Sequence, residues 1–176
     1  MRRRFWRELK HGGRDKLNRP HITTPSNEMD LSDTQKAYLA GLIDGDGSIF
    51  LSYYKYPTRK RGGIHSIISC AVSVRSANKE YAQEVLQMMR GKVGRVEENY
   101  FEVIISRQAD ILQFIEAILP YLRLKRKEAE IMIEFCRERL RDLRYRRNAP
   151  YTAKCFELVD EMKALHNVPM HKREWK

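Results

Sequence analysis

The feature that most constrains this chain is residues 37–43, Ala-Tyr-Leu-Ala-Gly-Leu-Ile, which are apolar or small on every side. A surface helix carries apolar residues along one stripe only, so a helix of this composition has to be buried all round. Ser32 and Gln35 have the spacing of a capping box, which predicts that the helix begins there and runs over about 33–45. One domain covers only one side of such a helix, so another surface must cover the rest.

Two glycines in this helix, Gly41 and Gly45, lie one turn apart and allow a second helix to approach closely. A two-fold copy of the same helix is the economical partner, and it brings both copies of Asp46 to one place. The alternative is an ordinary core helix with incidental glycines. The residues expected at the dimer interface are Tyr38, Gly41, Leu42 and Gly45.

The helix ends in Asp-Gly-Asp-Gly-Ser, residues 44–48, which places two carboxylates where a buried element normally avoids charge. A cation site explains this pattern. An EF-hand loop counted from Asp44 fails, because Ile49 stands at its glycine position and Lys55 at its closing glutamate position. A Mg²⁺ site that shares ligands with a phosphate remains, with Mn²⁺ or Ca²⁺ as substitutes.

Beyond the helix the apolar residues alternate with period two and then return to helical spacing. The pattern predicts strands at 48–56, 65–75, 92–97 and 100–106, and helices at 77–90, 108–119, 124–143 and 152–166. Two hairpins with helices between them indicate an α+β fold, in which helices cover one face of a four-stranded antiparallel sheet. The other face is then free for a ligand.

The formal net charge of +11 indicates a polyanionic partner, most often nucleic acid. We expect one domain at 31–166, a basic extension at 1–30 and a short tail at 167–176. The first 28 residues hold 8 Lys and Arg against 3 acids. They act either as an arm on phosphates or as a solvated tail.

Three cysteines with no short spacing support neither a disulfide framework nor a zinc site. No apolar run approaches the roughly 18–20 residues that span a bilayer, and no apolar segment follows the basic N-terminus. We therefore expect an intracellular protein, in a prokaryotic cytoplasm or in an organelle such as a mitochondrion or chloroplast, with no membrane or small-molecule substrate as partner.

Residues 38–48, Tyr-Leu-Ala-Gly-Leu-Ile-Asp-Gly-Asp-Gly-Ser, resemble the motif of the single-motif LAGLIDADG homing endonucleases, with Gly45 in place of the alanine. The likeness extends over about residues 31–166. It implies an intron-encoded homodimer that makes a site-specific double-strand break in a long, nearly palindromic DNA target. It also implies that Asp46 and the Gly45 carbonyl hold the divalent ions, while Asp44 is structural.

A second segment, residues 120–129, resembles the part of the homodimeric relatives whose basic residue approaches the scissile phosphate. The matching residue is Lys125, with Arg126 and Lys127 beside it on the DNA. Ions held by two Asp46 carboxylates would activate water for attack on phosphorus, and Lys125 would offset the phosphate charge. The alternative for Lys125 is a solvated lysine at a helix start.

The chain departs from its relatives at Val74, where they often carry a glutamine that orders active-site water. Ser73, Arg75, Asn78 and Lys79 are close enough in sequence to supply a polar replacement. A one-residue error in register would also produce this discrepancy.

The exposed sheet face is expected to follow the DNA major groove and to place alternate side chains on base edges. The turn at 59–61 is expected to hold phosphates, and the arginine-rich segment 137–147 either adds phosphate contacts or is a solvated helix end. The expected DNA-binding residues are Phe50, Ser52, Tyr54, Tyr56, Arg59, Lys60, Arg61, His65, Ser69, Ser73, Arg75, Arg95, Glu97, Tyr100, Glu102, Arg126 and Lys127.

Two readings compete with the endonuclease: a non-cleaving nucleic-acid binder of the same fold, such as an intron maturase or a repressor, and a structural RNA-binding protein. Cleavage that depends on Mg²⁺ distinguishes the endonuclease from both of these alternatives.

Overall fold

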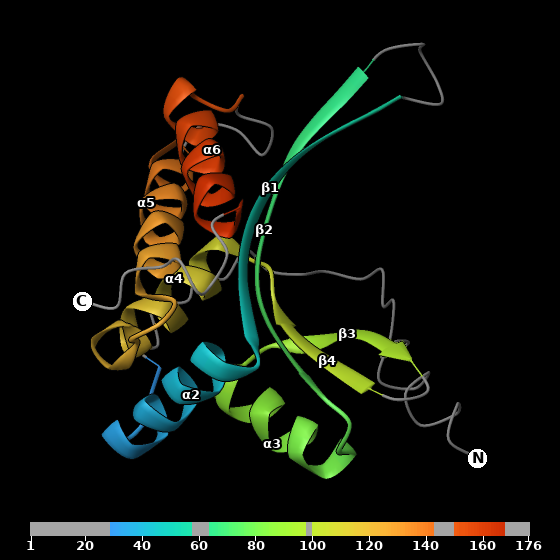
Figure 1. The fold of residues 1–176 in the computed structure, drawn as a ribbon, viewed down its shortest axis with the longest axis vertical. Helices are drawn as coiled ribbons and strands as arrows, with labels where there is room; N and C mark the ends of the chain where they lie inside the picture. The colour runs from blue at the N-terminus through green and yellow to red at the C-terminus, as the bar shows by residue number, and fades with distance from the viewer. Residues whose placement is uncertain (1–28, 58–63, 98–99, 143–149, 168–176) are drawn as a thin grey trace, which may run out of the picture.

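A computed structural model of the chain describes residues 29–57, 64–97, 100–142 and 150–167. Its elements are labelled as in Figure 1. The helices are α2 (Asp33–Gly45), α3 (Lys79–Met89), α4 (Gln108–Ile118), the 3-10 turn η1 (Leu119–Tyr121), α5 (Arg126–Asp142) and α6 (Ala153–Asn167). The strands are β1 (Gly47–Pro57), β2 (Ile64–Ser76), β3 (Lys92–Glu97) and β4 (Tyr100–Ile105). Within the described ranges no helix combines the length and apolar character needed to cross a bilayer.

The four strands form one antiparallel sheet in the order β1-β2-β4-β3. β1 pairs with β2 along its full length, opposite residues 64–74, whereas β4 pairs with β2 only over residues 72–76. In Figure 1, α2, α4, α5 and α6 all lie on one side of the β1–β2 hairpin, and the opposite face of the hairpin carries no helix. The predicted α+β layout, a four-stranded sheet covered by helices on one face, is therefore confirmed.

Helix α2 begins where the capping box predicted. The Ser32 hydroxyl accepts the Gln35 backbone N–H at 3.3 Å, and the Gln35 side-chain oxygen accepts the Ser32 N–H at 2.9 Å. Each side chain thus satisfies an amide that the first helical turn leaves without a partner. The other helices and strands begin and end within about two residues of the predicted positions, which is the usual scatter of element ends.

The core lies between the sheet and the helices. Ile49 and Leu51 of β1, and Ile68 and Val72 of β2, are almost fully buried, as their alternation predicted. The three cysteines are free and buried, and burial raises the pKa of the Cys70 thiol to about 11. The core therefore needs no disulfide to hold the two layers together.

Candidate active site and nucleic-acid interface

The turn from α2 into β1 presents Asp46 at the surface. Asp46 is the C-cap residue of α2, and its N–H donates to the Leu42 carbonyl at 2.9 Å. At Gly47 the chain turns so sharply that an added Cβ would lie 2.6 Å from the Cα of Ile43. Only glycine fits there, so the glycine after Asp46 fixes the direction in which the carboxylate leaves the helix.

The Asp46 carboxylate is exposed, and no hydrogen bond or ion pair engages it within the described part of the chain. One carboxylate and nearby main-chain carbonyls are oxygen donors of the kind that Mg²⁺ accepts together with water and phosphate. The described residues contain no group of three or more His, Cys, Asp or Glu side chains able to hold a metal by themselves. The donor set of one chain therefore fits a hard cation but does not complete its shell.

Asp44 has a different environment. Its two carboxylate oxygens accept the backbone N–H groups of Arg123 and Lys125, at 2.8 and 2.9 Å. These bonds attach the loop between η1 and α5 to the end of α2. The prediction that Asp44 is structural is confirmed, and the segment it holds is the one that carries Lys125.

We expect Asp44→Ala to lower the free energy of unfolding by roughly 2 kcal/mol, because two amides lose a charged acceptor. Urea denaturation measures this loss, and Asp44→Asn, which keeps one acceptor oxygen, should fall between the wild type and Asp44→Ala. Wild-type stability in both variants would contradict a structural role for Asp44.

Lys125 reaches back to the same helix end. Its ammonium donates to the carbonyls of Ile43 at 2.6 Å and of Asp44 at 2.9 Å. A cation at the C-terminus of a helix is favoured by the partial negative charge of the free carbonyls. The structure thus brings together Asp46 and Lys125, which are 79 positions apart in the sequence.

A tyrosine pair flanks this site and was missed by the sequence analysis. A hydrogen bond of 2.9 Å joins the hydroxyls of Tyr38 on α2 and Tyr81 on α3. Burial, the hydrogen bond with Tyr38 and the negative charges of Asp46 and Glu84 all raise the pKa of the Tyr81 hydroxyl. Tyr81 therefore stays protonated beside Asp46. Only its apolar helical spacing was visible in the sequence.

Val74, the departure from the relatives' pattern, is buried and pairs with Gly47 on β1 and Val103 on β4. Three of the polar residues suggested as replacements for the glutamine are buried or bonded to other residues. Ser73 is buried, and Arg75 pairs with Glu102 at 3.4 Å. The Asn78 side chain accepts the Tyr81 N–H at 2.9 Å and caps α3.

One face of α2 is left uncovered by the other described residues. Leu39, Ala40 and Ile43 are fully buried, whereas Tyr38 is 45% exposed. The uncovered face has helical spacing and consists of Thr34, Ala37, Tyr38, Gly41 and Gly45. An added Cβ at Gly41 or Gly45 would meet nothing within 4 Å. No packing among the residues that the structure describes explains these two glycines. Leu42, also predicted at the interface, is half buried against the core.

The outer face of the sheet carries several of the predicted DNA-binding residues. Tyr54 is exposed, and Phe50, Ser52 and Ser69 are half buried. Ile67, opposite Tyr54, and Lys92, opposite Ile104, are exposed on the same face and were not predicted. Strand alternation could have found Ile67, whereas the bulge between Val93 and Val96 hides Lys92 from it.

Ser73 is a correction to the prediction, because it is only 4% exposed. Its partners are Ser48 on β1 and Ile104 on β4, so it lies on the outer face but between two flanking strands. A side chain this short does not emerge past its neighbours, and Ser73 is not placed to contact bases.

Arg75, Tyr100 and Glu102 form a cluster on that face. The Arg75 guanidinium lies 5.3 Å from the centre of the Tyr100 ring and pairs with Glu102, whose side chain is 13% exposed. Arg59, Lys60 and Arg61 lie outside the described residues. The structure describes the backbone but not the side chains of Tyr56, His65, Arg95 and Glu97. A β-bulge between Val93 and Val96 interrupts the alternation on which the Arg95 prediction depended.

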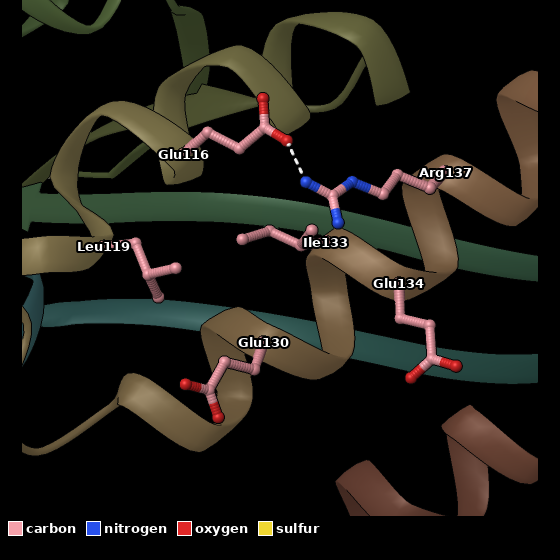
Figure 2. Close-up of a pocket in the computed structure, with 6 residues that line it drawn as sticks. All are labelled: Glu116, Leu119, Glu130, Ile133, Glu134 and Arg137. Atoms are coloured by element: carbon pink, nitrogen blue, oxygen red, sulfur yellow. Dashed lines mark hydrogen bonds and ion pairs between the residues drawn. The ribbon is translucent and has the colours of Figure 1, made fainter.

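A groove between α4 and α5 lies apart from these residues (Figure 2). It is lined by Glu116, Leu119, Glu130, Ile133, Glu134 and Arg137. Arg137 bridges it by pairing with Glu116 at 2.7 Å. The other two acids pair with Arg126 and Lys154. All three carboxylates of the groove are thus neutralised within the chain.

One of these ion pairs involves a basic residue that was predicted to bind DNA. Arg126 is tied to Glu130 on α5 at 3.1 Å, whereas Lys127 is exposed. Arg139 is only 8% exposed and stacks on Tyr151. In the described part of segment 137–147, the arginines therefore make structural contacts, and residues 143–147 lie outside the described residues.

Comparison with known proteins identifies the class. The sequence model described as LAGLIDADG endonuclease matches residues 39–136, from the middle of α2 into α5. This match spans more than half of the chain, and the chain belongs to the LAGLIDADG endonuclease family. No curated protein sequence matches it.

Solved structures of homing endonucleases share the fold. I-CvuI, crystallised in complex with its target in the presence of Ca, is 18% identical with a TM-score of 0.58, over 80% of this chain and 86% of that chain. I-TnaI is 14% identical with a TM-score of 0.56, over 79% and 90%. The archaeal intron-encoded I-Vdi141I, complexed with DNA, is 12% identical with a TM-score of 0.51, over 75% and 98%. At these identities the likeness concerns the fold.

Proposed function

We propose that this protein is a homodimeric homing endonuclease that makes a site-specific double-strand break in a long, nearly palindromic DNA by Mg²⁺-dependent phosphodiester hydrolysis. The observation that carries the proposal is the exposed Asp46 carboxylate at the end of a helix whose small-residue face no described residue covers. A second copy of the chain would cover that face of α2. It would also bring a second Asp46 to the cation site and so complete the set of ligands.

Dimerisation is supported by the character of the uncovered face of α2. Glycine in a helix interior, such as Gly41, costs about 1 kcal/mol relative to alanine. No contact among the described residues requires Gly41 or Gly45. Close approach of a second backbone gives both glycines a purpose. A two-fold axis beside this face would place both Asp46 carboxylates near each other, with one Lys125 beside each.

Chemistry at this site follows from the donor set. Mg²⁺ held there would lower the pKa of bound water and stabilise the leaving 3′ oxygen. Asp46, with the Gly45 carbonyl, would bind the ion, and Lys125 would turn from the Ile43 and Asp44 carbonyls toward the phosphate. Asp44 keeps Lys125 within reach by holding the backbone of its loop.

DNA binding is proposed for the outer face of the sheet. That face is free of helices in Figure 1 and carries Tyr54, Ile67, Lys92 and the Arg75 cluster. The net charge of +11 supplies the attraction for phosphates. Homing endonucleases of this fold have been crystallised with DNA, including I-CvuI and I-Vdi141I.

A second candidate is favoured by Val74: a non-cleaving nucleic-acid binder of the same fold, such as an intron maturase or a repressor. An apolar, buried residue stands where the relatives often carry a water-ordering glutamine, and Ser73, Arg75 and Asn78 are committed elsewhere.

A selection for cleaved DNA tests the proposal. Purified protein is incubated with a library of long, nearly palindromic duplexes, with Mg²⁺ and with EDTA. We expect a defined set of duplexes to be cut only with Mg²⁺. Tight binding without any cut duplex would favour the second candidate instead.

We expect Lys125→Met to lower the single-turnover cleavage rate by roughly 10²-fold while DNA affinity changes little, because one charge near the transition state is lost. Lys163→Met, an exposed lysine of α6, is the matched control. Circular dichroism checks that the protein remains folded without the Lys125 bonds. A wild-type rate in Lys125→Met would remove Lys125 from the mechanism.

A further inference from the structure

The β1–β2 hairpin extends well beyond the rest of the sheet. We call residues 50–57 and 64–71 the outer hairpin. β4 pairs with β2 only from Val72 onward, so no strand of the described chain borders β2 over residues 64–71. A two-stranded ribbon is marginal by itself. In Figure 1, α5 and α6 lie beside this part of the hairpin, and they cover one face of it.

A tyrosine hydroxyl lies at the free edge of the outer hairpin. Tyr151, just before α6, accepts the Ile68 N–H at 3.0 Å and donates to the Ile68 carbonyl at 3.4 Å. Both main-chain groups would otherwise face the open edge of β2. Tyr151 therefore takes the place of a neighbouring strand at the middle of this edge.

Tyr151 is itself held firmly by the helices. The Arg139 guanidinium of α5 lies 4.5 Å from the centre of the Tyr151 ring and donates to the Pro150 carbonyl at 3.2 Å. The Thr152 hydroxyl donates to Glu138 at 3.2 Å. A buried arginine stacked on the ring leaves the tyrosine little freedom to turn.

An aromatic contact fixes the other strand to the same helices. Phe156 of α6 packs edge-on against Tyr53 of β1, with ring centres 5.3 Å apart, and against Tyr151 at 6.2 Å. The hydroxyl of Tyr53 donates to Ser66 of β2 at 3.0 Å, which joins the two strands. The outer hairpin is thus attached to α5 and α6 at β1 by packing and at β2 by Tyr151.

We propose that Tyr151 is a positioning residue that fixes the outer hairpin and so sets base preference at the target positions farthest from Asp46. Tyr54 and Ile67, opposite each other on the outer face, would be the side chains it positions. Tyr54 is seven residues from Gly47, which is roughly 23 Å along the strand or about seven base steps. This inference rests on the proposed function.

The first test needs no DNA. Tyr151→Phe removes only the hydroxyl and keeps the ring against Arg139 and Phe156. We expect the Ile68 amide to exchange with solvent roughly tenfold faster, while the amides of residues 72–76 keep their protection. Tyr121→Phe, which removes a hydroxyl near the start of α2, should leave Ile68 unchanged. Unchanged Ile68 exchange in Tyr151→Phe, or a uniform rise over the whole sheet, overturns the positioning role.

The second test reads base preference. Duplex libraries randomised across the half-site are selected for cleavage by the wild type and by Tyr151→Phe. In Tyr151→Phe we expect base preference to fall several-fold at the target positions farthest from the cut and to stay unchanged at the positions beside the cut. Unchanged outer preference, or an equal fall at every position, overturns the proposal. A wild type that neither binds nor cuts any duplex overturns the proposed function instead, while the exchange experiment still reports on the Tyr151 contact.

Discussion

Asp46→Asn will lower the rate of DNA cleavage by roughly 10³-fold while the protein stays folded and binds its target about as tightly as the wild type. The amide keeps the size of the side chain but loses the charge that would bind Mg²⁺. Folding should not suffer, because Asp46 is exposed and its backbone N–H, not its carboxylate, closes the end of α2. Single-turnover cleavage and a binding titration in Ca²⁺ measure the two effects separately.

The matched control for this prediction is Asp160→Asn on α6, which removes another exposed carboxylate, far along the chain. It should cleave like the wild type. If Asp46→Asn cuts at the wild-type rate, Asp46 is not the ligand of the catalytic ion. If both Asp46→Asn and the wild type bind DNA without cutting it, the protein is a non-cleaving nucleic-acid binder.

The fold was predictable from the sequence because its elements have clear periodicity and clear ends. The capping box at Ser32 and Gln35 marked the start of α2, and Pro120 marked the end of α4. Alternation placed Ile49 and Leu51 in the core. These are local signals, and the packing of the whole fold agrees with each of them.

The details of the site were less predictable, because they depend on contacts between distant segments. Asp44 was expected to hold a helix end, but its partners, the amides of Arg123 and Lys125, come from a loop far along the chain. The contact of Tyr38 with Tyr81 depends on how α3 packs beside α2. Neither spacing nor composition reports such pairs.

The outer face shows a second limit of periodicity. Alternation states which way a side chain points but not whether it reaches solvent, and so Ser73 faces outward yet is buried between β1 and β4. A bulge also breaks the alternation in β3. Alternation predicts exposure best for long side chains on the outer hairpin, such as Tyr54, which is exposed.

Gly41→Lys is expected to convert the protein from a dimer to a folded monomer. A Cβ added at Gly41 meets no described residue within 4 Å. Lysine also favours a helix by up to about 1 kcal/mol over glycine, so each subunit should become slightly more stable. In a two-fold contact between α2 helices, two lysines would face each other where only backbone fits. Like charges brought together in this way cost several kcal/mol, so the dimer dissociation constant should rise by roughly 10²-fold or more.

Sedimentation velocity measures the dissociation constant, and urea denaturation of the dissociated subunits measures their stability. Ala164→Lys on the exposed side of α6 adds the same charge elsewhere and should remain dimeric. Cleavage by Gly41→Lys should fall together with the dimer population and return at high protein concentration, because each subunit retains Asp46 and Lys125. A Gly41→Lys protein that stays dimeric would show that the two glycines serve another purpose and that the subunits meet elsewhere. A wild type that stays monomeric on its target would separate catalysis from dimerisation altogether.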